Sequence, residues 1–162
     1  MPASYTADFS AFSDLFEGAE QNVKFALEAG LNRMANQARN LAPVGETGHL
    51  KGSIRGGQIE GSFAGGTIHG DLSATAPGAE AQEFGSGIHG ERGAPIEIRP
   101  RFKRALRFPI AGSVAAGSDG YGFAKLVRHP GVRARRFLQQ GVESDLDTLS
   151  AEIAEAITSG KR

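Results

Sequence analysis

Apolar side chains recur every three or four positions through the first quarter of the chain, the spacing of one face of an α-helix. This pattern predicts a helix over residues 8–42, with Asp8 as its cap and with Gly18 and Gly30 as positions where it can bend or break. Pro43 ends the helix, because the residue before a proline is pushed out of the helical region. The apolar face consists of Phe12, Phe16, Ala19, Val23, Ala26, Leu27, Leu31, Met34, Ala38 and Leu41.

The same spacing returns near the end of the chain and predicts a second amphipathic helix over residues 135–159. Its apolar face consists of Phe137, Leu138, Val142, Leu146, Leu149, Ile153 and Ile157. Between the helices, residues 50–128 form short strand-like segments divided by glycines. The expected strands are 50–59, 63–74, 96–99, 105–110 and 121–128, with a short helix at 77–84 and glycine-rich loops at 85–95 and 111–120. We therefore expect an α+β fold, a small, mostly antiparallel sheet packed by the long N-terminal helix and the C-terminal helix.

Composition narrows the class of protein. The 162 residues fit a single domain, residues 1–162, with a substantial core. The absence of cysteine excludes a disulfide scaffold, a cysteine-ligated zinc site and a thiol nucleophile. No apolar run approaches the roughly 18 residues of a membrane-spanning helix, so no membrane partner is expected.

Charge is balanced overall but strongly segregated. Residues 1–91 carry five basic and eleven acidic side chains, residues 92–136 carry eleven and two, and residues 137–162 carry two and five. The net charges of these blocks are therefore −6, +9 and −3. Blocks of opposite sign favour internal pairing or complementary surfaces between copies, while a solvated basic face is the simpler alternative.

Catalytic motifs are missing from the sequence. The four histidines do not occur at the spacing of a metal site; they are His49, His69, His89 and His129. Residues 85–90 match GxGxxG but lack the preceding strand and following helix of a dinucleotide site. Neighbouring carboxylates such as Glu80 and Glu83 favour a solvated helix face over a catalytic pair. We expect no catalytic residue, no metal site and no cofactor, and hence not an enzyme.

Three short segments carry a distinct pattern: residues 42–50, 81–87 and 129–138. In the first, Leu50 is expected to start a strand. In the third, Pro130 and Gly131 fit the centre of a type II turn. The final helix then begins near Arg135 with several arginines in its first turn, which opposes the helix dipole and suggests an external anionic partner.

Taken in order, LAPVGETGHLKGSI, AEAQEFGSG, KRALRFPI and RHPGVRARRFLQQGV between two helices resemble the neck or tail-completion protein family of tailed bacteriophages, also described as phage tail component or minor tail protein Z-like. The resemblance covers roughly residues 20–157. Two positions depart from the family pattern: alanine replaces the usual aromatic before EFG, and Gly45-Glu46 adds a residue to the first turn. The motif and interface residues that the resemblance implies are Pro43, Thr47, Gly48, Leu50, Glu83, Phe84, Gly85, His129, Pro130, Gly131, Arg133, Arg135, Arg136 and Phe137.

The resemblance implies a structural virion protein of the head–tail connector, in an infectious phage, a gene-transfer agent or a defective prophage. Such a protein forms a ring with itself, six-fold or alternatively twelve-fold. It is found in the host cytoplasm during assembly and in the neck or tail of the finished virion. Its neighbours are head-closure (stopper) proteins on one side and tail-terminator or tail-tube proteins on the other. DNA passes through the ring without sequence-specific binding.

The charge blocks suggest how copies meet. The basic residues 128–136 are expected to face Glu80, Glu83 or Glu91 of an adjacent copy or neck partner, and the loops 85–95 and 111–120 to make contacts or face the channel. The alternative function is a nucleic-acid-binding module that uses the basic segment 92–136. Its stacking residues would be Phe102, Phe108, Tyr121 and Phe123.

Overall fold

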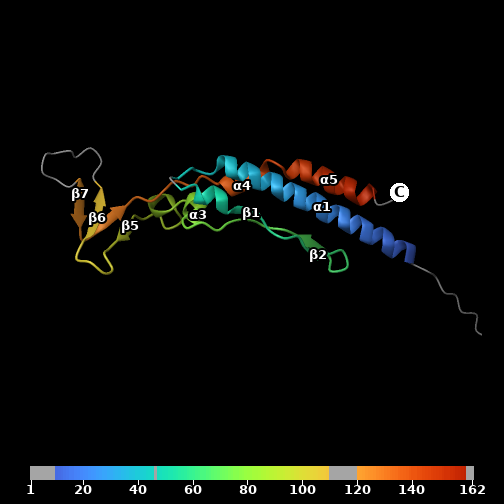
Figure 1. Cartoon of the computed structure of the whole chain (residues 1–162), viewed down its shortest axis with the longest axis horizontal. Coiled ribbons are helices and arrows are strands. Elements are labelled where there is room, and N and C mark those ends of the chain that lie inside the picture. The colour runs from blue at the N-terminus through green and yellow to red at the C-terminus, as the bar shows by residue number, and fades with distance from the viewer. Residues whose placement is uncertain (1–9, 46, 110–119, 160–162) are drawn as a thin grey trace, which may run out of the picture. The chain divides into compact units, whose positions relative to one another are not determined.

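The computed structural model describes residues 10–45, 47–109 and 120–159, and only the backbone of residues 10–16 and 109 (Figure 1). The helices are α1 (Ser10–Leu41), α2 (His49–Ser53), α3 (Ala79–Phe84), α4 (Phe137–Glu143) and α5 (Leu146–Ser159), with a 3₁₀ turn, η1 (Gly87–His89). The strands are β1 (Ile54–Gly56), β2 (Glu60–Ser62), β3 (Thr67–His69), β4 (Leu72–Ala74), β5 (Ile96–Ile98), β6 (Leu106–Pro109), β7 (Tyr121–Ala124) and β8 (Val127–His129). The predicted α+β class is confirmed.

The strands pair antiparallel, but in four two-stranded ladders where one small sheet was expected: β1 with β4, β2 with β3, β5 with β8, and β6 with β7. Each described strand has only three or four residues, because glycines and turns interrupt every strand-like segment. The segment 121–128, expected as one strand, is divided between β7 and β8.

The chain forms two compact units. Residues 1–79 and 136–162 form what we call the helical unit, and residues 80–135 form the strand unit. A domain in the thermodynamic sense unfolds as one cooperative step, so the expectation of a single domain stays a prediction.

In the helical unit, α1 packs along α4 and α5, and β1 lies against it (Figure 1). Two clusters make the core: Ala35, Ala38, Ala42, Ile54 and Phe137 in one, and Leu31, Met34 and Leu149 in the other. Much of the predicted apolar face of α1 is therefore confirmed as buried, although Leu41 is exposed and Ala42 takes the inward position. Phe137 and Ile54 are fully buried, and each contributes about 1.5–3 kcal/mol by leaving water. Asp8 lies outside the described residues.

Glycines mark where the helices approach most closely. Gly30 does not break α1; it leaves a notch in which a Cβ would lie 2.8 Å from Leu149 Cδ1. At Gly141 in α4, a Cβ would lie 2.8 Å from Ala38 Cβ and 2.9 Å from the Met34 carbonyl oxygen. Glycine here allows the backbones of α1 and α4 to come together.

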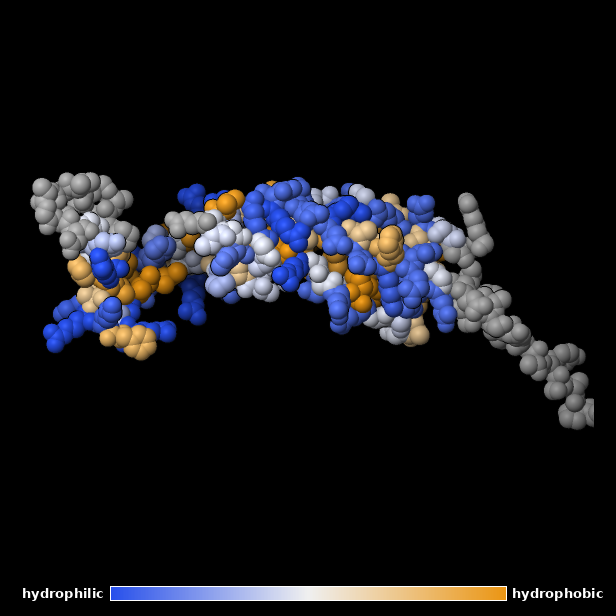
Figure 2. Space-filling view, in the orientation of Figure 1, coloured by the Kyte–Doolittle hydropathy of each residue, from blue (hydrophilic) through white to orange (hydrophobic). Residues whose placement is uncertain are grey.

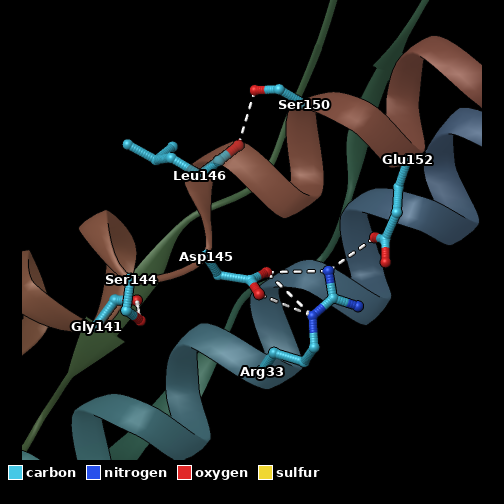
Figure 3. A network of polar contacts seen from close by, with 7 residues as sticks. All are labelled: Arg33, Gly141, Ser144, Asp145, Leu146, Ser150 and Glu152. Carbon is cyan, nitrogen blue, oxygen red and sulfur yellow. Dashed lines mark hydrogen bonds and ion pairs between the residues drawn. The ribbon is translucent and has the colours of Figure 1, made fainter.

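The expected C-terminal helix over 135–159 is two helices, because the chain turns at Ser144 and Asp145. At this turn, Asp145 is held by Arg33 of α1, whose Nε donates to Oδ1 at 3.0 Å and to Oδ2 at 3.1 Å (Figure 3). Arg33 Nη2 also donates to Glu152 in α5 at 2.7 Å. The hydrogen bonds to Asp145, and then the one to Glu152, raise the pKa of Arg33. Asp145 directly precedes α5, a position that aspartate favours at helix starts.

The first turn after α1 also differs from expectation. Leu50 was expected to start a strand, but it lies in α2 and packs on the Ile54–Phe137 cluster. Gly48, with φ of 64°, precedes α2 and allows the chain to enter this short helix directly after the turn that follows Pro43.

The β2–β3 hairpin is tied to α1 through one carboxylate. Glu20 accepts a hydrogen bond from Lys24 Nζ at 2.6 Å and another from the Phe63 amide at 2.9 Å. The Lys24 ammonium first, and the Phe63 amide second, lower the pKa of Glu20 below its ordinary value of 4.5.

We predict opposite effects for alanine at two helical glycines. Gly18 faces open space, so Gly18→Ala is expected to raise the free energy of unfolding by about 0.5–1 kcal/mol through helix propensity. Gly141→Ala is expected to lower it by about 1–3 kcal/mol, because the methyl group meets the backbone of α1. Urea unfolding followed by circular dichroism measures both changes, and equal effects of the two variants would contradict the packing described.

We also predict that the Phe63 amide reports the ionisation of Glu20. As the pH falls through the lowered pKa, Glu20 gains a proton, and the stabilisation present above pH 4.5 is lost. The Phe63 amide proton shift, followed by NMR, should titrate with a midpoint below 4.5. Glu20→Gln should abolish this titration, and a midpoint at or above 4.5 would refute the contact.

Candidate functional site

Two of the three motif segments meet in the strand unit through their backbones. Ser86 N–H donates to the Val132 carbonyl at 2.9 Å, and Val132 N–H donates back to Ser86 Oγ at 3.1 Å. Ile88 N–H donates to the Pro130 carbonyl at 2.8 Å, and Arg135 N–H donates to the Gln82 carbonyl at 2.7 Å. We call the paired segments 82–88 and 130–135 the glycine joint.

Glycine is required at the centre of this joint. A Cβ on Gly87 would fall on the Pro130 carbonyl, and one on Gly131 would fall on the Ser86 carbonyl. Gly131 has φ of 92°, the positive value that the predicted type II turn requires. The Val132 amide, which would close such a turn, is taken by Ser86 instead. Gly85 is part of the same joint, so the start of the expected loop 85–95 is held in place by the 130–135 segment.

The remaining motif residues are divided between the two units. Pro43, Thr47, Gly48 and Leu50 surround the α1–α2 turn of the helical unit, and Phe137 lies in the same core cluster that Leu50 contacts. His129 ends β8, and its Nδ1 accepts the Gly131 amide at 2.9 Å. The first half of the third motif thus forms part of the glycine joint, and its Phe137 forms part of the helical core. Glu46 lies outside the described residues.

The arginines of the third motif do not occupy the first turn of a helix, contrary to expectation. Helix α4 begins at Phe137, after Arg133, Arg135 and Arg136, which are exposed. Arg136 has φ of 50° and is the one non-glycine residue with positive φ in the described chain. This left-handed conformation costs about 1 kcal/mol or more and turns the chain into α4. The expectation of an anionic partner relied on several arginines in the first turn of the final helix, and the structure does not place them there.

The expected acidic positions are not equivalent. Glu80 and Glu91 are exposed, but Glu83 is only 5% exposed. A buried carboxylate does not offer a docking point to another copy, so Glu83 is wrong as a surface contact. Phe84, next to it, is 71% exposed.

The strand unit carries a surface on which cations and aromatic rings alternate. Arg107 lies opposite Phe123 in the β6–β7 ladder, and its guanidinium carbon is 3.7 Å from the centre of the Tyr121 ring, so the three share one face. Phe102, in the loop before β6, is 98% exposed. Figure 2 shows hydrophobic and hydrophilic side chains side by side over β5–β7. We use the name basic–aromatic surface for the exposed cations and rings of the loop before β6 and of the β6–β7 ladder with the residue after it: Arg101, Phe102, Lys103, Arg104, Arg107, Tyr121, Phe123 and Lys125.

Part of the basic block is neutralised locally. Glu97 contacts Arg99 at 3.3 Å and Arg128 at 3.4 Å, across the β5–β8 ladder in the second case. The cations of the basic–aromatic surface make no ion pair with any carboxylate in the described residues. Positive charge is therefore concentrated around Phe102 and β6–β7.

A groove on the helical unit was not anticipated from the sequence. It lies between α1 and α5, has a volume of about 310 Å³, and is lined by Asn22, Phe25, Ala26, Ala29, Glu152, Glu155, Ala156 and Ser159. Phe25 is 75% exposed and lies outside the apolar spacing of α1. An aromatic residue displaced from the buried face was the one signal in the sequence.

No group of three histidine or carboxylate side chains converges to hold a metal ion within the described part of the chain. His69 is 3.8 Å from Glu60 at the exposed β2–β3 hairpin, and His129 belongs to β8. None of the described helices is both long and apolar enough to cross a membrane. Comparisons with family models, curated proteins and solved structures find no match for this chain.

We predict that the glycine joint tolerates no side chain at its centre. Gly93→Ala, at φ of 58° in open space, is expected to cost about 1–2 kcal/mol for its left-handed backbone. Gly131→Ala adds the displacement of the Ser86 carbonyl and is expected to cost about 1–3 kcal/mol more. Hydrogen exchange at Ser86 and Ile88 should accelerate in Gly131→Ala alone, and equal protection in both variants would refute the joint.

Proposed function

We propose that this chain is a structural protein of the head–tail connector of a tailed-phage-like particle. Copies form a ring in the neck, between head-closure proteins and the tail terminator or tail tube, and DNA passes through its channel. The proposal rests on the ordered motifs of the sequence and on one observation about the strand unit, the number of large apolar side chains that it exposes.

Among the described residues of the strand unit, eight large apolar or aromatic side chains are exposed: Phe84, Ile88, Ile96, Ile98, Phe102, Phe108, Tyr121 and Phe123. The described strands of this unit pair as two-stranded ladders, and an isolated two-stranded ladder is marginal in water. Exposed apolar surface on this scale is typical of a chain that is completed by protein neighbours. A ring supplies such neighbours on two sides of every copy, because one surface meets a different surface of the next copy.

The motifs support an architectural role in a second way. The 82–88 and 130–135 segments are held by main-chain hydrogen bonds and by glycines that admit no side chain. The glycines at Gly85, Gly87 and Gly131 are explained by the close approach of the two backbones. No substrate, metal or proton transfer is needed to account for them.

A nucleic-acid-binding module is the second candidate, favoured by the stacking of Arg107 on Tyr121 and by Phe102 among three cations. Aromatic rings with interleaved cations bind single strands through stacking and phosphate contacts. Affinity for DNA that falls steeply as salt rises, in the protein without partners, would favour this candidate.

The decisive experiment deletes the gene for this chain in a host that produces the particles. We expect DNA-filled heads and separate tails in the same lysate, with joined particles restored by the wild-type chain. Electron microscopy of the lysate counts each form, and labelled antibody should mark the neck of restored particles. Joined particles at the normal yield without the chain would overturn the proposal.

A variant pair refines the test. Arg133→Ala with Arg136→Ala removes two exposed cations beside the glycine joint and is expected to lower the yield of joined particles at least about tenfold. Lys51→Ala with Arg55→Ala removes two cations from the helical unit and should leave that yield unchanged. Matched circular dichroism spectra check that both variants are folded.

A further inference from the structure

The loop between β5 and β6 presents an aromatic ring within a group of cations. Phe102 is 98% exposed, and Arg101, Lys103 and Arg104 beside it are exposed as well. We call residues 101–104 the RFKR loop. None of its three cations meets a carboxylate in the described residues. An unburied phenylalanine held among unpaired cations fits a pocket with an apolar floor and an acidic rim.

The α1–α5 groove is such a pocket. Its apolar lining, which we call the floor, consists of Phe25, Ala26, Ala29 and Ala156, and its volume of about 310 Å³ lies at the lower end of the ligand-pocket range. Glu152 and Glu155 line it as well. Glu152 already binds Arg33, whereas Glu155 is exposed and makes no ion pair among the described residues.

The two units also have opposite total charges. The helical unit, residues 1–79 and 136–162, contains eight basic and thirteen acidic side chains, a net charge of −5. The strand unit, residues 80–135, contains ten basic and five acidic side chains, a net charge of +5. Charges of opposite sign on two surfaces steer two copies together in one orientation.

We propose that the RFKR loop of one copy docks in the α1–α5 groove of a second copy. Phe102 lies on the alanines of the floor. The flanking cations face Glu155 and the Glu152 oxygen that does not bind Arg33. Each copy has one loop and one groove, so the contact is heterologous and propagates from copy to copy until a ring closes. The inference rests on the ring of the proposed function and names the surfaces that build it.

The contact should be sensitive to both shape and salt. Burial of an aromatic side chain at the centre of an interface is typical of the residues that dominate binding. The surrounding ion pairs lie at the rim and are screened as salt rises. Self-association is therefore expected to weaken with salt but to depend chiefly on Phe102.

The test uses the full chain in solution and two variants that each destroy one surface. Phe102→Ser removes the ring from an exposed position, and Ala29→Arg fills the groove with a cation. Each variant is expected to lose self-association at least about tenfold relative to the wild type, as measured by analytical ultracentrifugation. Mixed together, they should form a dimer of one copy of each and nothing larger, because one intact groove then meets one intact loop.

Controls separate this contact from general effects of charge and folding. Glu155→Lys changes the rim without touching the floor and should also weaken association, which covers the case in which Ala29→Arg does not fold. Phe63→Ser and Glu17→Lys alter an exposed aromatic ring and an exposed carboxylate outside the loop and groove, and should associate like the wild type.

Three outcomes would overturn the inference. One is a wild-type chain that stays monomeric throughout, and another is self-association that Phe102→Ser and Glu155→Lys leave unchanged. The third is loss of DNA binding in Phe102→Ser with self-association intact, which assigns the loop to nucleic acid. In each of these cases the neck proposal is still decided separately by the particle experiment, because a ring can be built on other surfaces.

Discussion

The close approach of α4 to α1 is the constraint on which the helical unit depends. Gly141 lies directly against Ala38, and only because neither carries a larger side chain can Phe137, four residues before Gly141, reach the cluster of Ile54 and Ala42. That cluster also receives Leu50 from α2 and Leu72 from β4. The contact between α1 and α4 is made by alanine and glycine, which bury little area per residue, so it depends on close packing of the two backbones.

How much of this could be predicted from sequence depends on the range of the contacts. The long helix and its end at Pro43 follow from local periodicity and a local steric rule, and both are found. The break between α4 and α5 could not be seen, because Val142, Leu146, Leu149 and Ile153 keep helical spacing across it. It coincides with the contact between Asp145 and Arg33, which is 112 residues away in the sequence.

The same distinction applies to the candidate site. The motif segments were visible in the sequence, and the positive φ of Gly131 followed from its place after Pro130. Their pairing across 46 residues was not, since Ser86 and Val132 carry no mark of each other. The burial of Glu83 and the groove beside Phe25 also escaped prediction, because each is produced by the packing of separate elements.

The notch at Gly30 has a mechanical consequence. The Leu149 side chain fills the notch. Helix α5 therefore cannot slide along α1 by one helical turn, about 5.4 Å, unless Leu149 first leaves the notch. Arg33, one turn further along α1, grips Asp145 and Glu152 on both sides of that leucine. A force that shears α5 along α1 must therefore displace Leu149 from the notch and break both ion pairs of Arg33 together. The two helices consequently resist sliding and respond to such a force as one rigid body.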